Sequence, residues 1–191
     1  MLAEQTRKAA VEVWAYCLMP NHVHLILNPT RADDLGLAVG EAHRRYTNFI
    51  NARGRWTGHL FQSRFASVVM DELHLLAAVS YVSLNPERAG LAACAADWAW
   101  SSVRAHLAGK DDGLVTVGPV LDRVSCFADL LLGDRDEDFA ALRRAESTGR
   151  PVGTAEFVTG LERVLGRRIA RRAPGPMPEA KVNARQLKLL H

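Results

Sequence analysis

Two histidines, His22 and His24, are the residues of this sequence best suited to metal chemistry. They lie in a short run of β-forming residues bracketed by prolines at positions 20 and 29, which predicts one strand. Because side chains alternate along a strand, the two imidazoles share one face, and Val23, Leu25 and Leu27 share the apolar face. Neutral imidazole is the commonest metal ligand in proteins. The pair therefore predicts either a metal site or, as such pairs more often are, the polar face of a half-buried strand.

Tyr81 and Asn85 form a second chemically capable group. With His74 and Ala78 they follow one another at steps of four, three and four residues, which places all four on one face of a helix. A tyrosine on a helix is more often an amphipathic core residue. With Asn85 one turn away, it nevertheless forms a second constellation that strengthens the metal interpretation of His22 and His24.

The helix that carries these residues is expected to run from Glu72 to about Leu84. Asp71 is its predicted N-cap. Its end is placed before Pro86, because the residue preceding a proline is disfavoured in the α region. Asn85 would then lie at the frayed end, with its amide oxygen free to bind. The apolar residues of another face suit packing on a sheet, namely Leu73, Leu76, Ala77 and Leu84.

Three further elements are expected before this helix. Residues 2–9 resemble the last turns of a helix, and 11–18 form a strand that leads through a Met-Pro-Asn turn into the histidine strand. So short a connection predicts an antiparallel hairpin, which needs another strand or helix to be stable. A second helix should run from Asp33-Asp34 to about Ala52. Its predicted buried stripe consists of Val39, Ala42, His43, Tyr46, Phe49 and Ile50.

The segment 54–65 mixes glycines, arginines and aromatic residues in a way that suits single-stranded nucleic acid. Rings stack on unpaired bases, and guanidinium groups bind phosphates. The arginines expected to border the same groove as the histidines are Arg44, Arg45, Arg53, Arg55 and Arg64. Trp56 and Phe61 are expected to be further nucleic-acid contacts. In the alternative interpretation, Phe61 and Phe65 are core residues.

Charge is strongly segregated along the chain, although the net charge is only +3. Residues 111–138 hold eight acidic residues against two arginines, whereas 143–191 hold eleven basic residues against four glutamates. Basic blocks of this kind indicate a polyanionic partner. Arginine-rich solvated faces that reflect codon use are the other interpretation.

Composition and length limit the class of protein. A chain of 191 residues with 48% hydrophobic and 24% charged residues suggests one globular domain, with an appendage. No apolar run reaches the roughly 18 residues of a membrane span, and the N-terminus has no signal-peptide pattern. Three distant cysteines indicate neither a disulfide framework nor a zinc knuckle, so a reduced, cytoplasmic location is expected.

Four blocks carry a resemblance to a known family. "YCLMPNHVHLIL", "RRYTNFINARGRWTGHLFQSRF", "YVSLNPERAGL" and "DWAWSSVRAH" resemble successive blocks of the one-tyrosine HUH transposases. The subgroup is that of the REP-associated tyrosine transposases, relatives of the insertion-sequence-200-type enzymes. The resemblance covers residues 11 to about 107. The segment 143–175 resembles the C-terminal extension found in this subgroup, without a catalytic signature.

The resemblance implies a role for each matching residue. His22 and His24 correspond to the HUH pair, Tyr81 to the nucleophile and Asn85 to the third protein ligand of a divalent ion, Mg²⁺ or Mn²⁺. The implied reaction is cleavage and rejoining of single-stranded, hairpin-forming DNA through a 5′-phosphotyrosine. The expected partner is DNA resembling a repetitive extragenic palindrome. The resemblance is also compatible with a homodimer, and with a cytoplasmic, nucleoid-associated bacterial protein that has no membrane contact.

One departure concerns the start of the chain. Family members normally carry a preceding strand and most of the first helix of a ferredoxin-like fold, so this chain is expected to be a late-started or truncated copy. The predicted fold is an α+β, N-terminally truncated HUH sheet with flanking helices. Domain boundaries are expected at 1–107 for the catalytic part and 108–191 for an acidic linker and a basic helical extension. The alternative function is a remnant that recognises hairpin DNA without cutting. An HxH metallohydrolase on a (β/α)₈ barrel is disfavoured, because that fold needs about 250 residues.

Overall fold

The chain is built on one antiparallel β-hairpin. The computed structural model describes residues 1–132 and 136–170, and in it β1 (Val11–Leu18) pairs with β2 (Val23–Pro29). The register joins Leu18 to Val23 at the turn, and a bulge interrupts it between Val13 and Ala15. The structure confirms both the predicted hairpin and the α+β class.

Loop residues supply hydrogen-bond partners for backbone groups along the outer edge of β1. Leu18 N–H donates to the Trp100 carbonyl (2.8 Å), Ser102 N–H to the Tyr16 carbonyl (3.0 Å), and Thr116 N–H to the Val13 carbonyl (2.8 Å). The Tyr16 N–H in turn donates to the Ser102 hydroxyl at 3.0 Å. Because an unpaired buried backbone group is costly, these loop contacts replace part of a strand ladder along β1.

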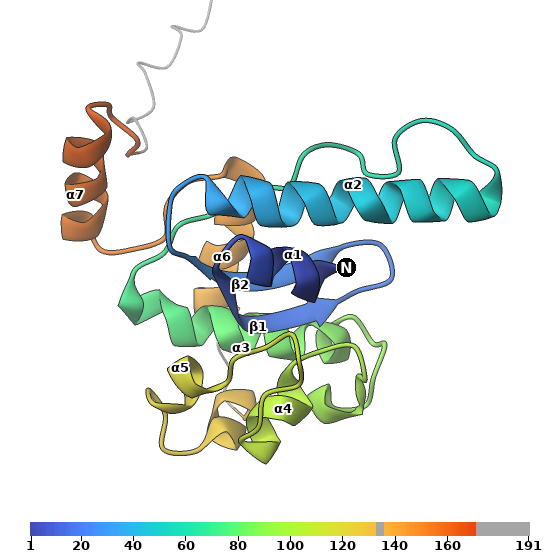
Figure 1. The fold of residues 1–191 in the computed structure, drawn as a ribbon. Helices are drawn as coiled ribbons and strands as arrows, with labels where there is room; N and C mark the ends of the chain where they lie inside the picture. Colours follow the sequence, from blue (N-terminus) through green and yellow to red (C-terminus); the bar gives the residue numbers. More distant parts are fainter. Residues whose placement is uncertain (133–135, 171–191) are drawn as a thin grey trace, which may run out of the picture.

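Seven helices and two 3₁₀ turns surround the hairpin in the described part of the chain (Figure 1). Helix α1 precedes β1, as expected, and the two longest helices, α2 and α3, follow β2. In chain order the elements outside the hairpin are α1 (Leu2–Lys8), α2 (Asp34–Gly54), α3 (Glu72–Arg88), η1 (Ala95–Asp97), α4 (Val103–Ala108), α5 (Gly118–Leu121), η2 (Phe127–Leu131), α6 (Asp136–Thr148) and α7 (Ala155–Leu165). No helix in residues 1–132 and 136–170 is long and apolar enough to cross a membrane.

Helix α3 is the central element of the core. Asp71 caps it as predicted, accepting a hydrogen bond from His74 N–H at 3.1 Å. Between Leu75 and Pro86, most residues are buried. They pack on the inward face of β1, which includes Ala15 and Cys17.

The predicted end of α3 was wrong. The helix continues through Pro86 to Arg88 instead of stopping near Leu84. A proline inside a helix removes one hydrogen bond, but Pro86 is fully buried, and its carbonyl accepts from Leu91 N–H at 2.8 Å. Tertiary packing thus holds a helical path that the local preference disfavours.

Helix α2 extends past the hairpin, and part of its predicted stripe is exposed (Figure 1). Val39 and Ala42 are buried as expected, but Tyr46 and Phe49 are 45% and 44% exposed. The helical period was predicted correctly. The sheet ends before the helix does, so the distal half of the stripe has no core to pack on.

The hydrophobic core also draws on residues after 107. Phe127, Leu130, Phe139 and Leu142 belong to the same buried cluster as β1 and α3. Of the predicted basic extension, α6 and α7 are helical, and no residue of α7 is buried. The remainder of that prediction, residues 171–191, lies outside the described residues.

Candidate functional site

The hairpin brings the two histidines together at the start of β2. His22 immediately precedes β2, and its carbonyl accepts a hydrogen bond from Met19 N–H at 2.9 Å, which closes the turn. His24 is the second residue of β2 and pairs with Cys17 of β1. Their rings meet edge to face, with centroids 4.7 Å apart, and their Nε2 atoms are 3.0 Å apart. The alternation predicted from the sequence therefore does place both imidazoles on one side of the strand.

Helix α3 delivers Asn85 and Tyr81 to the same place. The Asn85 side-chain nitrogen lies 3.0 Å from His24 Nε2. The Tyr81 ring lies edge-on to the His24 ring, with centroids 5.6 Å apart. His22, His24, Tyr81 and Asn85 thus converge, as predicted. The contact between Asn85 and His24 joins residues that are 61 positions apart in the sequence. Asn85 differs from expectation in one respect, because it sits within the helix and not at a frayed end.

The donor geometry fits a divalent ion. Two nitrogens that each bind one ion at about 2.1 Å and at right angles lie about 3.0 Å apart. The two Nε2 atoms have this separation, and the Asn85 carboxamide lies at the same distance from His24 Nε2. A half-turn of the carboxamide presents Oδ1 in place of the nitrogen. Among the described residues no cluster of three His, Cys, Asp or Glu side chains suits a metal. The amide is therefore needed to complete a set of three.

Glu146 on α6 is a member of this site that the sequence prediction missed. Its carboxylate lies 3.3 Å from His24 Nδ1 through Oε1, and it accepts a hydrogen bond from the Tyr81 hydroxyl through Oε2 at 3.2 Å. One signal for it exists in the sequence. Glu146 is one of four acids among eleven basic residues in 143–191, and it adjoins an apolar stripe at helical spacing, Phe139, Leu142 and Ala145.

Burial and charge set the protonation of the site. Burial raises the pKa of Tyr81, and the neighbouring charge of Glu146 raises it further. Burial also lowers the pKa of His22, with the proximity of His24 adding to the effect. For Glu146, burial alone would raise the pKa, but hydrogen bonding and charge from His24 outweigh it, so its pKa is lowered. The resting site therefore combines a protonated phenol, a neutral His22 and an ionised carboxylate near neutral pH.

Tyr81 is enclosed by aromatic and cationic groups. It is only 9% exposed, and its ring meets the Phe139 ring edge-on at 5.4 Å. The Arg88 guanidinium lies 5.9 Å from the Tyr81 ring and 4.5 Å from the Phe139 ring. The positive charge of Arg143 also acts on Tyr81. Among the described residues, Arg88 and Arg143 are thus arginines that act on the phenol, and neither was predicted.

The predicted arginine and aromatic set lies mainly along α2 and the loop after it. Arg44 and Arg45 form ion pairs with Glu41 at 2.7 and 2.9 Å. Arg45 also approaches Glu4. None of the contacts described for these two arginines reaches the histidines, so their predicted place beside the metal groove remains a prediction.

The aromatic members of this set are held differently. Phe61 stacks on His43 with ring centroids 4.0 Å apart and is half-buried, outside the hydrophobic core clusters, and its contact with DNA remains a prediction. Trp56 is 64% exposed and lies flat on Gly54, where an added Cβ would come within 2.6 Å of the indole. Arg53 lies over the Phe49 ring at 5.4 Å. Arg55 and Arg64 are exposed. The segment therefore exposes an indole face and several arginine side chains to solvent.

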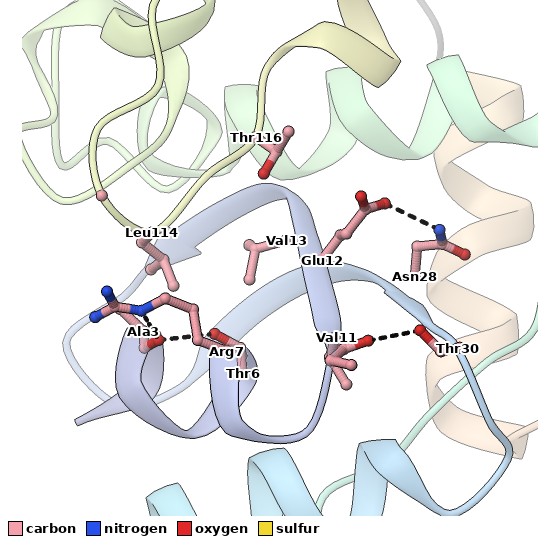
Figure 2. Close-up of a pocket in the computed structure, with 12 residues that line it drawn as sticks. Ala3, Thr6, Arg7, Val11, Glu12, Val13, Asn28, Thr30, Leu114 and Thr116 are labelled. Atoms are coloured by element: carbon pink, nitrogen blue, oxygen red, sulfur yellow. Dashed lines mark hydrogen bonds between the residues drawn. The ribbon is translucent and has the colours of Figure 1, made fainter.

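A cavity of about 470 Å³ lies elsewhere, between α1, the start of β1 and the loop 113–116 (Figure 2). Arg7, Thr6, Glu12 and Asn28 are among its lining residues, and Asn28 donates to Glu12 at 3.1 Å. None of the predicted site residues lines it. The converging histidines are therefore not part of this cavity.

Comparisons with known proteins find a family match for the first part of the chain. The family model described as "Transposase IS200 like" matches residues 1–85. A solved structure of a REP-associated tyrosine transposase bound to a REP hairpin is similar with a TM-score of 0.47 and 21% identity, over 60% of this chain and 68% of that chain. No curated protein matches. The matched segment contains His22, His24 and Tyr81 and ends at Asn85. The family match therefore covers the hairpin, α2 and most of α3, and it stops before α4.

Proposed function

We propose that the protein is a DNA-binding transposase that cleaves and rejoins single-stranded, hairpin-forming DNA. Tyr81 would be the nucleophile, and His22, His24 and Asn85 would hold a divalent ion, Mg²⁺ or Mn²⁺. The observation that carries the proposal is the convergence of two imidazole Nε2 atoms and one carboxamide at separations of 3.0 Å, beside the Tyr81 ring. The family match over residues 1–85 supports it.

The reaction would be a transesterification. The Tyr81 oxygen would form a bond to the scissile phosphorus, and the bond from phosphorus to the 3′ oxygen would break. The phenol would lose its proton, and the departing 3′ oxygen would gain one, leaving a 5′-phosphotyrosine and a free 3′-hydroxyl. A bound divalent ion supplies charge neutralisation and polarisation of the phosphate. The reverse reaction rejoins the strand.

The exposed segment around Trp56 would hold the DNA. Arg53, Arg55 and Arg64 would bind phosphates, and the free face of the Trp56 indole would stack on an unpaired base. Because each neutralised phosphate releases condensed counterions, affinity for a hairpin with single-stranded flanks should fall steeply with salt, with a slope near −0.7 per contact.

A second candidate function is hairpin binding without cleavage. It is favoured by the burial of Tyr81, which is 9% exposed, with its hydroxyl hydrogen-bonded to Glu146 at 3.2 Å. In that case the protein would bind the hairpin through the arginines and Trp56, while the phenol would never reach a phosphate.

A covalent-trapping assay separates the two functions. The protein is incubated with an end-labelled hairpin and Mg²⁺ or Mn²⁺, and a denaturing gel is inspected for a covalent protein–DNA band. Tyr81→Phe should abolish the band and leave hairpin affinity within about twofold, because only one hydroxyl is lost. His24→Ala should also abolish it in Mg²⁺, and Mn²⁺, which binds nitrogen ligands more tightly, should rescue it in part.

Tyr46→Phe is the matched control. It is the same chemical change on a tyrosine that is 45% exposed and belongs to α2, so the band should persist. A band that survives Tyr81→Phe and disappears in Tyr46→Phe would assign the nucleophile to Tyr46. Hairpin binding by the unaltered protein, without a band in either metal, would establish the binding-only function.

A further inference from the structure

The site contains a carboxylate from outside the matched segment. Glu146 is on α6 (Asp136–Thr148), 61 residues beyond Asn85, where the family match ends. Helix α6 contacts α3 and lies beside the hairpin (Figure 1). The question is whether Glu146 belongs to the chemistry or only covers it.

The position of Glu146 is fixed by the core. Phe139, Leu142 and Ala145 are 3–6% exposed and belong to the same buried cluster as Tyr81. They occupy the face of α6 that packs inward, and Glu146 follows directly after Ala145. Its side chain is 44% exposed, so one side faces water and the other faces His24 and Tyr81. Packing of α6 therefore brings the carboxylate to these two groups.

The two carboxylate oxygens serve two different partners. Oε1 lies 3.3 Å from His24 Nδ1, and Oε2 accepts from the Tyr81 hydroxyl at 3.2 Å. A carboxylate accepts hydrogen bonds and donates none. A neutral His24 therefore gains by carrying its proton on Nδ1, which leaves the Nε2 lone pair directed at His22 and Asn85. The tautomer of a metal-binding histidine is commonly set in this way, by the partner of its other nitrogen.

We propose that Glu146 is a positioning residue of this site, which fixes the Nδ1–H tautomer of His24 so that Nε2 is free to bind a divalent ion, and which orients the Tyr81 hydroxyl with its second oxygen. The inference rests on the proposed function in one respect, namely that the site binds a divalent ion and uses Tyr81. The tautomer itself can be measured without any cleavage. Helix α6 is then a functional part of the transposase site, although it lies beyond the family match.

Glu146→Gln is the discriminating variant. Its amide has almost the same shape as the carboxylate, so the packing of α6 should persist. It both donates and accepts, and can therefore pair with either tautomer of His24. Glu156→Gln makes the same change on an exposed residue of α7 and is the control. Far-UV circular dichroism and thermal unfolding should show all three proteins equally folded.

Two readouts test the proposal apart from activity. Long-range ¹H–¹⁵N NMR of histidine-labelled protein at pH 8 should show His24 as the Nδ1–H tautomer in the unaltered protein and in Glu156→Gln. It should show a mixture in Glu146→Gln. Mn²⁺ titration followed by electron paramagnetic resonance should show roughly tenfold weaker binding for Glu146→Gln only, since the hydrogen-bond partner of a metal-binding histidine is typically worth 10- to 100-fold in metal affinity.

The outcomes separate this inference from the proposed function. An unchanged His24 tautomer in Glu146→Gln overturns the role of Glu146, whatever the activity. Mn²⁺ binding that is insensitive to His24→Ala overturns the metal site of the proposed function and leaves the tautomer result to decide on Glu146. If Glu146→Gln unfolds, Glu146→Asp replaces it. The shorter side chain keeps the charge but withdraws the carboxylate from His24 Nδ1, so the proposal then requires a mixture of His24 tautomers together with weaker Mn²⁺ binding.

Discussion

Two serines on α3 provide a matched test of the packing in the core. Ser80 and Ser83 are 0% and 1% exposed and lie three residues apart on the same helix. The Ser80 hydroxyl donates to the Leu130 carbonyl of η2 at 2.7 Å. Within the described part of the chain, the Ser83 hydroxyl has no hydrogen-bond partner. The same substitution, serine to alanine, should therefore have opposite effects at the two positions.

The magnitudes follow from the contacts. Either substitution gains about 0.5 kcal/mol of helix propensity. Ser80→Ala removes a hydrogen bond and leaves the buried Leu130 carbonyl without its donor, at a cost of about 1–3 kcal/mol. We expect a net loss of about 1–2 kcal/mol. Ser83→Ala removes a buried hydroxyl that nothing satisfies, and we expect a gain of about 1–2 kcal/mol. The two variants should thus differ by about 3 kcal/mol in the free energy of unfolding.

Urea unfolding at pH 7.5, followed by circular dichroism, measures both variants against the parent protein. The slopes with denaturant should agree, and the midpoints should move in opposite directions. In thermal unfolding, a difference of about 3 kcal/mol corresponds to roughly 6–12 °C for a chain of this size. Two variants that are destabilised equally would refute the reasoning. That result would mean that burial alone, and not hydrogen bonding, sets the cost of these substitutions.

Three further predictions test separate parts of the molecule. In a fluorescence anisotropy titration, Trp56→Ala should weaken hairpin binding by roughly 5- to 150-fold, since base stacking is worth about 1–3 kcal/mol. Trp100→Ala is the control, because Trp100 has the same 64% exposure, and it should leave binding unchanged. Burial lowers the pKa of His106, so the folded protein holds it neutral, and the free energy of unfolding should fall as the pH drops below about 6.5. The slope from this group is at most about 1.4 kcal/mol per pH unit, and His106→Gln should flatten it. Asp71→Ala should cost about 2 kcal/mol by urea unfolding, because the Asp71 carboxylate accepts from His74 N–H at 3.1 Å and from Thr154 N–H at 2.7 Å.

Each of these predictions has a contrary result. Equal losses of affinity in the two tryptophan variants would mean that DNA does not stack on Trp56. Stability that rises on acidification from pH 7 to 5.5, with a slope that His106→Gln abolishes, would mean that the buried imidazole is charged in the folded state. An Asp71→Asn variant that is as costly as Asp71→Ala would show that the charge, and not the hydrogen-bond acceptor, stabilises the start of α3.

The part of the site on the hairpin and α3 could be predicted because it depends on local periodicity. Alternation along β2 places His22 and His24 on one side, and helical spacing places Tyr81 and Asn85 on one face. The contacts between these pairs at 3.0 Å confirm both periods. The capping role of Asp71 was also predictable, since a capping side chain and its helix are adjacent in sequence.

Other features depend on packing between distant segments and could not be predicted in this way. Pro86 indicated a helix end, but burial of its ring keeps α3 helical to Arg88. The period of α2 gave no information on where the sheet beneath it ends, so the exposure of Tyr46 was missed. The position of Glu146 requires knowing that α6 packs on α3, which no local pattern specifies.

The burial of α3 also constrains which substitutions this protein can accept in evolution. The helix supplies Tyr81 and Asn85 to the site and, at the same time, the largest share of buried residues in the core. A substitution of either side chain would also alter packing against β1, η2 or α6, so few neighbours could vary independently. The segment around Trp56 contributes little to the core, because most of its residues are exposed to solvent. If the loop after α2 binds DNA as proposed, divergence in DNA preference should accumulate there, while Tyr81 and Asn85 stay tied to the stability of the whole molecule.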